Sequence, residues 1–498
     1  MSPSPRLSAG ELIRLVTDPG TFRSWDAPPV DVHPDAAYAE ALAGAREKSG
    51  VDEAVLTGEG AIRGRRVAII VCEFRFLAGS IGIAAAERLV EAIERATREG
   101  LPLLAGPASG GTRMQEGTLA FLSMVKISAA VAKHKAARLP YLVYLRHPTT
   151  GGVMASWGSL GHVTVAEPGA LVGFLGPRVY EAIYGESFPE NVQTSENLFQ
   201  NGLIDGVVSP EHLPEIVDRV LAVLSAAPPA GEVAAPEQWS GTVTPTWESI
   251  TLSRREARPG IRALLHYGAH DVVPLNGTGQ GEKDRGLVLA LARFGESSCV
   301  VMGQDRRAQR EQAPLGPAAL REARRGMRLS EELGLPLVTV IDTPGVALSK
   351  EAEEGGLAGE IARCLAELVM LPSLTISVIL GEGTGGGALA LLPADHTLAA
   401  EHGWLSPLPP EGASAIVHRD TTHAAEMAEA QGVGAPALLG NGIIDWIVPE
   451  HPDASSEPGP FCRRVGAALE YLLARRGAEE QASRLDARLE RYRGLGLR

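Results

Sequence analysis

The sequence repeats itself once, at a nearly constant offset between its two halves. LPLLAGPASGG, beginning at Leu101, is matched by LPLVTVIDTPG at Leu335, and NGLIDGVV at Asn201 is matched by NGIIDWIV at Asn441. Between them, in the same order, TTGGV around Gly151 and Gly152 is matched by GGGAL around Gly386 and Gly387, and EPGAL at Glu167 by EHGWL at Glu401. Four matches in constant order predict a duplication, so the two halves should share one fold.

Each half alternates short apolar runs with amphipathic segments. We expect buried strands at 67–74 and in LPLLAG and LPYLVYL of the first half, and in SCVVMG, LPLVTVID and LTISVIL of the second. Helices are expected at 83–98, 118–137, 317–333 and 359–370. Short buried strands that alternate with helices predict a parallel sheet with helices packed on it. The predicted fold class is α/β, twice over.

The length and the composition suggest where the chain divides. A chain of 498 residues is too long for one ordinary core. The stretch 226–245 is rich in Pro, Ala and Gly, which is typical of a linker. We therefore expect an N-terminal domain at 1–225, a linker at 226–245 and a C-terminal domain at 246–498.

Charge and hydropathy exclude several classes of protein. The net charge of −14 argues against a general nucleic-acid or membrane-surface binder. No apolar run reaches the roughly 18 to 20 residues that span a bilayer, and the N-terminus has no signal-peptide pattern, so we expect a cytoplasmic protein. The four cysteines never form a C-x-x-C pair, which excludes an obvious zinc ribbon, and Cys72 and Cys364 are expected in the core.

Glycine-rich turns directly follow the predicted strands in both halves. A strand that leads through glycines into a helix leaves backbone N–H groups free, and a ligand oxygen can approach them closely. Two such donors form an oxyanion hole, in which each donor stabilises the transition state by about 3 to 4 kcal/mol. A lone Gly-Gly pair is usually only a turn, but matched pairs in both halves favour a site. These turns are Ser109-Gly110-Gly111, Gly151-Gly152, Pro344-Gly345 and Gly385-Gly386-Gly387.

Other catalytic patterns are not found in the sequence. The segments around Ser80 and Ser159 lack the first glycine of a G-x-S-x-G nucleophile elbow. There is no phosphate-binding P-loop, so we expect Asp342 to be a turn or cap residue. Three histidines lack metal-ligand spacing and are expected to be structural: His147, His162 and His396. The pattern indicates a reaction in which the substrates supply the base and the protein stabilises negative charge.

Longer motifs resemble a known family. SGGTRMQEG (109–117) and the segments 148–179 and 193–208 resemble the beta subunit of bacterial acetyl-CoA carboxylase carboxyltransferase. VIDTPG (340–345), GEGTGGGALA (381–390) and SPLPPEGASAI (406–416) resemble its alpha subunit, and the fused order resembles single-chain beta subunits of biotin-dependent acyl-CoA carboxylases. The resemblance implies two tandem crotonase-like ββα-spiral domains. The N-terminal half would bind acyl-CoA, and the C-terminal half would receive carboxybiotin from a separate carrier protein.

The resemblance also implies roles for individual residues. Gly151 and Gly152 would hold the thioester oxygen, and Ser109, Gly110 and Gly111 would line the acyl-CoA pocket. Gly386, Gly387 and Ala388 would offer amides to the ureido oxygen of biotin. Decarboxylated biotin would then remove the α-proton of the thioester, and the enolate would attack carbon dioxide, which explains why two holes and no side-chain base suffice.

Two arginine clusters and one alanine bear on the substrate. Arg63, Arg65 and Arg66 are candidates for the 3′-phosphate of CoA, and Arg306, Arg307 and Arg310 for a phosphate contact. In each cluster the alternative is a solvated surface charge run. Ala390 lies where related carboxylases tune acyl-chain size, and its small side chain favours a short acyl group.

Departures from the family and missing parts define the expected partners. The chain lacks the N-terminal four-cysteine zinc ribbon, so no zinc is expected, and it reads EEGG (353–356) where the family has EERG. It has no A-M-K-M biotinylation motif and no ATP-grasp region, so biotin carboxylase and a biotin carboxyl carrier protein are expected partners. The family's shared site implies a homo-oligomer, either a dimer or a ring of dimers. The segment 478–492 predicts a terminal helix, either docked on a partner or solvated.

Two other functions stay open at this point. A malonate or malonyl-thioester decarboxylase would use the same oxyanion holes in the opposite direction and without biotin. A non-catalytic structural subunit is favoured by the changed EEGG segment and opposed by the intact Gly-Gly pairs.

Overall fold

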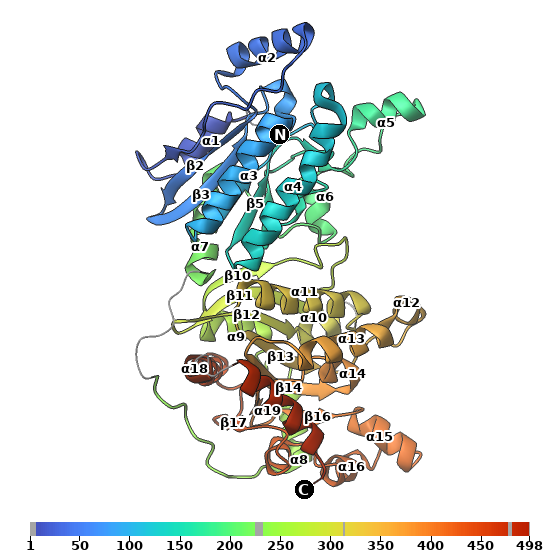
Figure 1. The fold of residues 1–498 in the computed structure, drawn as a ribbon. Helices are drawn as coiled ribbons and strands as arrows, with labels where there is room; N and C mark the ends of the chain where they lie inside the picture. Colours follow the sequence, from blue (N-terminus) through green and yellow to red (C-terminus); the bar gives the residue numbers. More distant parts are fainter. Residues whose placement is uncertain (1–5, 225–232, 312–313, 477–480, 498) are drawn as a thin grey trace. The chain divides into compact units, whose positions relative to one another are not determined.

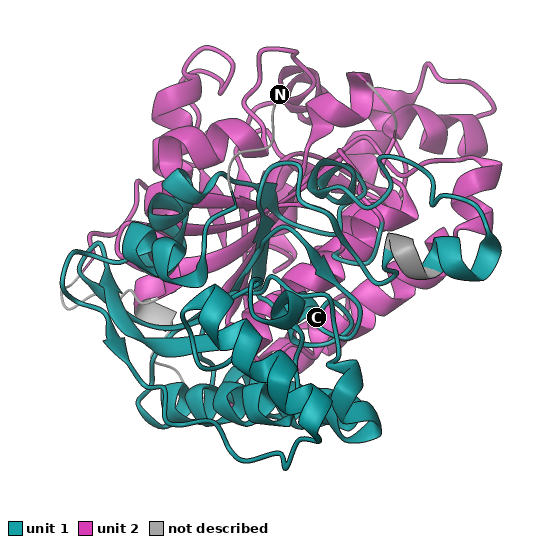
Figure 2. Cartoon of the chain, turned by 90° about the horizontal axis from the view of Figure 1, so that it is seen from above, with its two compact units in different colours: residues 1–222, 279–281 teal, residues 223–278, 282–498 magenta. Residues whose placement is uncertain are grey.

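The computed structural model describes residues 6–224, 233–311, 314–476 and 481–497. The chain forms two compact units, shown in Figure 2: unit 1 contains Met1–Ala222 and Gly279–Gly281, and unit 2 contains Val223–Thr278 and Glu282–Arg498. Of the predicted linker, residues 226–232 lie outside the described residues, and 233–245 form neither helix nor strand.

Unit 1 is built on a seven-stranded sheet in which a small antiparallel edge continues into parallel strands (Figure 1). The first two pairings are antiparallel and the other four are parallel. In sheet order the strands are β1 (Arg23–Ser24), β2 (Val55–Ile62), β3 (Arg65–Cys72), β4 (Leu103–Gly106), β5 (Tyr141–Leu145), β7 (Val163–Ala166) and β9 (Gly206–Val207).

Unit 2 repeats this sheet strand for strand. Two antiparallel pairings again lead into four parallel ones. The strands are β10 (His270–Leu275), β11 (Leu287–Phe294), β12 (Ser297–Gln304), β13 (Leu337–Thr343), β14 (Thr375–Thr384), β15 (His396–Ala400) and β17 (Trp446–Val448). The short β16 (Trp404–Ser406) pairs with the end of β14, just as β8 (Val172–Gly173) pairs with β6 (Thr149–Thr150) in unit 1.

Isolated bridges show that the repeat is in register. Ile81 pairs with Thr112 in unit 1, and Leu315 pairs with Val346 in unit 2. The offset from Ile81 to Leu315 is the same as that from Thr112 to Val346, and it is also the offset between the matched motifs at Leu101 and Leu335. The duplication and the α/β fold class predicted from the sequence are therefore confirmed.

The principal helices lie close to their predicted positions. In unit 1, α3 (Ile83–Arg98) and α4 (Gly117–Ala136) pack against each other, and in unit 2 α11 (Pro317–Leu333) packs against α13 (Leu357–Val369). Apolar side chains of α3 and α4, such as Leu89, Ile93 and Ile127, are fully or almost fully buried in the core of unit 1. Their helical spacing is the signal that made both helices predictable.

Shorter helices complete the two units. In unit 1 these are α1 (Ala9–Val16), α2 (Ala36–Ser49), α5 (Pro177–Tyr184) and α6 (Ser195–Gln200), and α7 (Leu213–Leu224) crosses the division between the units, which follows Ala222. In unit 2 they are α8 (Thr246–Ser253), α9 (Ile261–Gly268), α10 (Arg306–Glu311), α12 (Lys350–Glu354), α14 (Gly385–Leu389), α15 (Pro410–Val417), α16 (Ala424–Ala430), α17 (Ala435–Gly440), α18 (Pro458–Arg476) and α19 (Gln481–Gly494). No helix in the described parts of the chain is long and apolar enough to cross a membrane.

The terminal helix α19 packs on unit 2 of its own chain, so it is not simply solvated, and its docking on a partner stays a prediction. Its first predicted residues, 478–480, lie outside the described residues. The buried Arg488 donates to both carboxylate oxygens of Asp395, at 2.9 and 2.6 Å, and to the carbonyl oxygen of Leu371. Tyr492 accepts a hydrogen bond from the Ala394 backbone N–H at 2.9 Å. A planar guanidinium with five donors can satisfy several acceptors at once, which is why a charged residue forms this contact.

The structural role predicted for Asp342 needs correction in its detail. Asp342 is neither in a turn nor at a cap: it lies in strand β13, is fully buried, and accepts the backbone N–H of Glu382 at 3.1 Å. Burial raises the pKa of its carboxyl group. The expectation for the two cysteines is confirmed, because Cys72 and Cys364 are both fully buried.

The isolated histidines have structural partners. His147 and His162 each accept a backbone N–H through Nδ1, from Leu171 and Tyr141 respectively, both at 3.0 Å. Burial lowers the pKa of His162 to about 3, so its ring is neutral at physiological pH. Nδ1 of His396 lies 3.9 Å from the Asp445 carboxylate.

Candidate active site

The Gly151 turn in unit 1 depends on glycine for two reasons. Gly151 has a φ of +64°, and a Cβ added there would lie 3.2 Å from Cα of Gly111. This φ lies in the left-handed region, which favours glycine. The short Cβ distance shows that two backbone segments approach each other closely, which also favours glycine. Its N–H donates to the carbonyl oxygen of Phe174 at 2.9 Å. Gly151 therefore shapes the turn, and its amide is already engaged.

The next two residues, Gly152 and Val153, carry the amides that this turn leaves free. The backbone after Gly151 makes one helical turn, in which the N–H of Ala155 returns to the Gly151 carbonyl oxygen. Within the described residues, the N–H groups of Gly152 and Val153 have no acceptor. A first turn with unpaired donors is the arrangement that binds a ligand oxygen. The prediction from the sequence included Gly152 and missed Val153, because an apolar side chain gives no sign that its backbone amide is free.

The Ser109-Gly110-Gly111 segment lies directly against this turn, as its predicted role requires. The buried Ser109 side chain accepts the N–H of Gly111 at 3.0 Å, and its carbonyl oxygen accepts the N–H of Thr150 at 2.9 Å. The N–H of Gly110 donates to the carbonyl oxygen of Ala78 at 2.9 Å. The structure therefore brings all five predicted glycine-segment residues of unit 1 together.

In unit 2 the equivalent turn begins the short helix α14. Gly385 has a φ of +68° and follows Thr384, just as Gly151 follows Thr150, so the structural counterpart of Gly151 is Gly385. In a helix capped by Thr384, the N–H groups of Gly386 and Gly387 have no acceptor within the helix, whereas that of Ala388 does. Ala388 is fully buried, and so is Ala390 where the helix ends.

Gln304 fixes the position of this second turn and was not found from the sequence. It is fully buried on β12, and its side chain donates to the carbonyl oxygen of Gly387 at 2.7 Å while accepting the N–H of Asp342 at 3.1 Å. A single amide thus ties α14 to β13. Only the pairing of distant strands places it there, which is why no local pattern indicated it.

The side chains that touch the two turns are not bases. A Cβ at Gly152 would lie 3.2 Å from Oγ1 of Thr112 and 3.5 Å from Cγ of Met124. At Gly387 the neighbours are Val346, Leu315 and Gln304. Among the described residues, no group of three or more His, Cys, Asp or Glu side chains could hold a metal ion. The turns can stabilise negative charge through backbone donors, and none of these neighbouring side chains would remove a proton.

The arginines of α10 are largely engaged within unit 2. Arg306 is buried and donates to the carbonyl oxygen of Ser253, and Arg310 pairs with Glu382 at 2.8 Å. Arg254 holds the other oxygen of Glu382 at 2.8 Å, so this carboxylate is fixed shortly before Gly385. Arg307 is exposed and pairs with Glu311.

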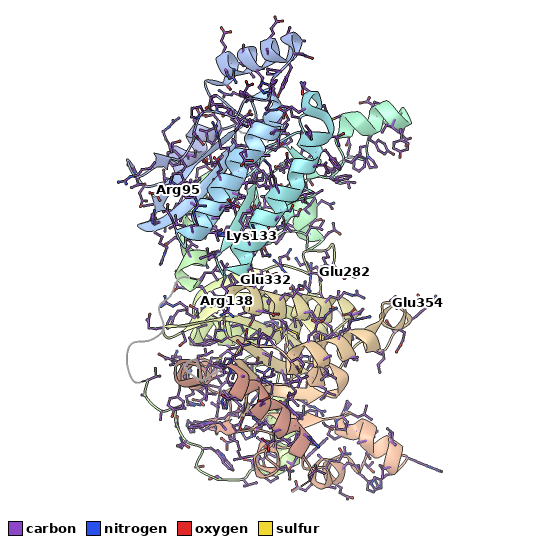
Figure 3. All side chains as sticks on the ribbon, in the orientation of Figure 1. Arg95, Lys133, Arg138, Glu282, Glu332 and Glu354 are labelled. Carbon is purple, nitrogen blue, oxygen red and sulfur yellow. The ribbon has the colours of Figure 1, made fainter. Side chains whose placement is uncertain are left out.

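The structure does not bring Arg63, Arg65 and Arg66 together with the glycine turns. They lie at the hairpin between β2 and β3, at the start of β3, whereas the glycine segments follow the ends of β4 and β5 in the same parallel sheet. Arg65 pairs with Asp218 at 2.8 Å, and Arg66 pairs with Glu59 and Glu99. Glu99 also pairs with Arg95, which Figure 3 labels on α3. Their role as phosphate contacts stays a prediction.

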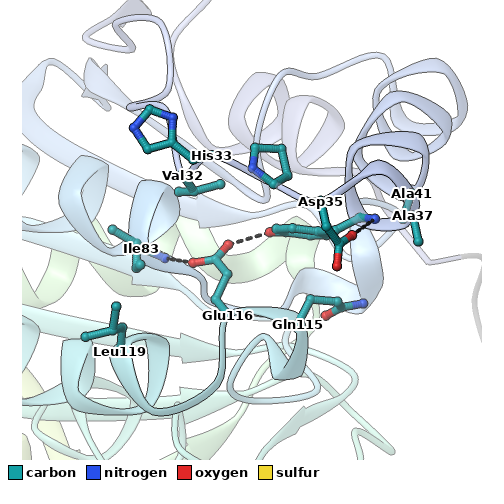
Figure 4. Close-up of a pocket in the computed structure, with 11 residues that line it drawn as sticks. Val32, His33, Asp35, Ala37, Ala41, Ile83, Gln115, Glu116 and Leu119 are labelled. Atoms are coloured by element: carbon teal, nitrogen blue, oxygen red, sulfur yellow. Dashed lines mark hydrogen bonds between the residues drawn. The ribbon is translucent and has the colours of Figure 1, made fainter.

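A pocket of about 630 Å³ borders the start of α3 and α4 (Figure 4). Its floor carries Glu116, which accepts the backbone N–H of Ile83 and the hydroxyl of Tyr38. Burial, with the Glu116 hydrogen bond, raises the pKa of Tyr38 to about 12. Nearby, the fully buried Arg113 pairs with Glu53. This polar network fixes the segment that carries the Ser109–Gly111 loop into α4.

Comparison with known proteins gives the family. The model of the carboxyl transferase domain family matches residues 5–482. A Mycobacterium tuberculosis protein described as a probable biotin-dependent acyl-coenzyme A carboxylase beta3 subunit is 59% identical over 495 residues, which cover 99% of each chain. The acetyl-coenzyme A carboxylase carboxyl transferase subunits beta/alpha of Salinispora arenicola are 36% identical, over 94% of this chain and 86% of that protein.

Solved structures agree on the fold. The transcarboxylase 12S structure with methylmalonyl-coenzyme A and methylmalonic acid bound superposes with a TM-score of 0.73 at 22% identity, covering 93% of this chain and 89% of that one. A single-chain, multi-domain long-chain acyl-CoA carboxylase gives a TM-score of 0.68 at 19% identity, covering 90% of this chain and 45% of that one. The crotonase-like fold of both halves is thereby confirmed. The chain belongs to the carboxyl transferase family, as a carboxyltransferase subunit of the biotin-dependent acyl-CoA carboxylases.

Proposed function

We propose that this chain moves a carboxyl group from carboxybiotin, on a separate carrier protein, to acetyl-CoA or another short acyl-CoA, and so makes malonyl-CoA or its homologue. The observation that carries the proposal is the pair of equivalent turns with free amides, at Gly152 and Val153 and at Gly386 and Gly387. Both follow strands at equivalent places of a duplicated fold, as two oxyanion holes for two anionic oxygens require.

In the proposed reaction the chain stabilises charge and positions its substrates. The amides of Gly152 and Val153 hold the thioester oxygen as it becomes an enolate oxygen. The amides of Gly386 and Gly387 hold the ureido oxygen of biotin. Carboxybiotin is a substrate here, which supplies the carboxyl group and, once decarboxylated, the base. These backbone N–H groups are fixed in place before the reaction, and they interact most strongly with the oxygens as negative charge develops on them. They therefore lower the activation barrier of the transfer.

A short acyl group is the finer part of the proposal. Ala390 is small and fully buried at the end of α14, which supports a confined acyl site. Relatives carry names that refer to acetyl-CoA and to acyl-CoA in general, so acetyl-CoA is the first substrate to test.

The proposed partners are a biotin carboxylase, a biotin carboxyl carrier protein and further copies of this chain. Support for a homo-oligomer comes from α4, where apolar side chains stay 53% to 67% exposed: Leu119, Phe121, Leu122 and Val125. An exposed apolar face of this kind marks an interface. Its last residue, Val125, directly follows Met124, the neighbour of Gly152, so an interface there would lie close to the candidate site.

The reverse reaction tests the proposal. The purified chain is given malonyl-CoA or methylmalonyl-CoA with free biotin or biocytin, and loss of the carboxyl group is followed. Decarboxylation that depends on biotin supports a carboxyltransferase, and the faster substrate gives the acyl preference. Biotin-independent loss would support the decarboxylase alternative. Bound CoA without turnover would favour a structural subunit or a different acyl chain.

A further inference from the structure

Strand β14 of unit 2 is irregular shortly before the turn that begins α14. It pairs in parallel with β13 (Figure 1), and the register of this pairing shifts between Ile341 and Thr343. As a result, Asp342 alone lies opposite residues 380–382 of β14, which form a bulge. An irregularity of this kind bends a strand and re-aims the residues that follow it. Here the residues that follow are those of α14, with its free amides.

Side chains supply the hydrogen bonds that the bulge removes from the ladder. Oδ1 of Asp342 accepts the backbone N–H of Glu382 at 3.1 Å. At the start of the bulge, the buried Arg258 donates to the carbonyl oxygen of Leu380 at 2.9 Å. Gly381 makes room for the carboxylate, because a Cβ there would lie 2.5 Å from Oδ1 of Asp342. The bulge is therefore held by side chains as well as by the neighbouring strand.

The carboxylate of Asp342 is fully buried and has few partners. Oδ1 lies 3.6 Å from Nε of Arg306, and Oδ2 has no hydrogen-bond partner among the described residues. Arg258 is held by Glu450 through two hydrogen bonds, of 2.7 and 2.8 Å. Burial raises the pKa of Asp342, whereas Arg306 and Arg258 lower it. Because a buried charge is weak evidence for stability, the hydrogen bond to the bulge is the stronger indication of what this carboxylate does.

Unit 1 lacks both members of this hydrogen bond. The register shifts in the same way after β4 and β5, so unit 1 has an equivalent bulge. In the repeat, Ala108 occupies the position of Asp342 and offers no side-chain acceptor. Pro148 occupies the position of Glu382, and proline has no N–H to donate. The acceptor is thus present in the half that has a donor and is missing from the half that has none.

We propose that Asp342 is a positioning residue for the turn that begins α14, and that it aims the amides of Gly386 and Gly387 at the ureido oxygen of biotin. This inference rests on the proposed function, because it takes these two amides as the ones that hold biotin. Asp342 acts from both sides of the turn. Its carboxylate holds the N–H of Glu382 before the turn, and its own N–H donates to Gln304, whose side chain donates to the carbonyl oxygen of Gly387.

The test compares Asp342→Ala with Asp342→Asn, which keeps an oxygen that can accept the N–H of Glu382. Biocytin-dependent decarboxylation of malonyl-CoA gives kcat/KM for biocytin, and titration calorimetry gives the Kd for CoA. We expect Asp342→Ala to lower kcat/KM for biocytin about 10²-fold, because a displaced turn presents both donors poorly. The Kd for CoA should stay within about twofold, because the proposed function places CoA on unit 1. Asp342→Asn should recover most of the activity.

Ser330→Ala is the matched control. Ser330 is fully buried on α11, and its hydroxyl donates to the carbonyl oxygen of Leu335 at 2.7 Å. The variant therefore also removes one buried hydrogen bond from unit 2, at the end of α11 and not beside α14, and it should keep kcat/KM for biocytin within about twofold. Hydrogen exchange followed by mass spectrometry adds a measurement without substrate. The segment 382–392 should exchange faster in Asp342→Ala than in wild type or Ser330→Ala.

The outcomes separate this role from the proposed function. Wild-type kcat/KM for biocytin in Asp342→Ala, or an equal loss in Asp342→Asn or Ser330→Ala, would overturn the role of Asp342. If circular dichroism shows that Asp342→Ala does not fold, Gly381→Ala takes its place, because its methyl group displaces the same carboxylate. If the wild type shows no biotin-dependent turnover, the proposed function fails and hydrogen exchange decides alone. Faster exchange of 382–392 would then support the positioning of the turn, and unchanged exchange would overturn it.

Discussion

Ser109 and Thr343 occupy equivalent positions of the two halves and make the same hydrogen bond. The side-chain oxygen of each accepts the backbone N–H of the glycine two residues further along the chain, at 3.0 Å for Gly111 and 3.1 Å for Gly345. Both glycines have a positive φ, so each hydroxyl holds a turn that other residue types would strain. The duplication therefore extends to the hydrogen bonds that shape the two candidate holes.

The hydroxyl of Thr343 is expected to support both stability and transfer. Thr343→Val keeps the shape of the side chain but removes its hydroxyl. The N–H of Gly345 then loses its acceptor, and the side-chain oxygen of Gln309 loses its donor. Leaving buried polar groups unpaired costs about 1 to 3 kcal/mol. The free energy of unfolding from urea titration, and the rate of biotin-dependent decarboxylation, should both fall. Thr343→Ser keeps the hydroxyl and should resemble wild type; equal losses in both variants would contradict this role.

Substitution within the glycine turns should abolish carboxyl transfer. A Cβ at Gly387 would lie 2.8 Å from Cγ1 of Val346, and one at Gly152 would lie 3.2 Å from Oγ1 of Thr112. Valine at either position displaces the turn and its donors, and losing one such donor costs about 10²- to 10³-fold in rate. Circular dichroism checks that each variant folds. Gly440→Ala, a helical glycine with nothing within 4 Å, is the control. Substantial activity in Gly152→Val or Gly387→Val would refute the site.

The sequence was sufficient for features that depend on local patterns. Apolar runs located the strands, helical spacing located α3, α4, α11 and α13, and the paired glycines located both turns. It was insufficient where a residue acts through a partner brought near by strand pairing. Val153 acts through its backbone, and Gln304 and Arg488 reach partners far along the chain. Because side-chain type says little about such distant partners, these three could not be inferred from one sequence.

The ion pair of Arg488 should make α19 essential to the stability of unit 2. The side chains of Arg488 and Asp395 are both almost fully buried, so Arg488→Ala leaves a buried carboxylate whose remaining cation, Arg484, lies 3.8 Å away. Breaking a buried pair on one side costs about 3 to 5 kcal/mol. Urea unfolding should show a loss of this order, whereas Arg493→Ala, an exposed cation on the same helix, should change little. If Arg488→Ala is as stable as wild type, α19 does not contribute to the fold in this way.

A charge difference distinguishes α3 from its repeat α11. Arg88 on α3 is buried and pairs with Asp52 at 2.8 Å, whereas the equivalent position of the repeat on α11 is Glu322, also buried. Among the described residues, Oε2 of Glu322 is buried without a hydrogen-bond partner. The pKa of Glu322 is raised to about 7, chiefly by burial. Arg325 lowers this pKa and the neighbouring Asp284 raises it, and both effects are included in the value.

Glu322 should make unit 2 less stable as the pH rises. Below the ordinary pKa of 4.5 the group is protonated in both folded and unfolded chains and has no effect on their balance. Between 4.5 and about 7 the folded state keeps a proton that the unfolded state has lost, so the free energy of unfolding falls as the pH rises. The total effect is at most about 3 kcal/mol and is complete above pH 7. Glu322→Gln should remove this slope and be more stable than wild type at pH 8, with little difference at pH 4.5. Urea titrations of both proteins across this range measure it; parallel curves for the two proteins would show that Glu322 is ionised throughout.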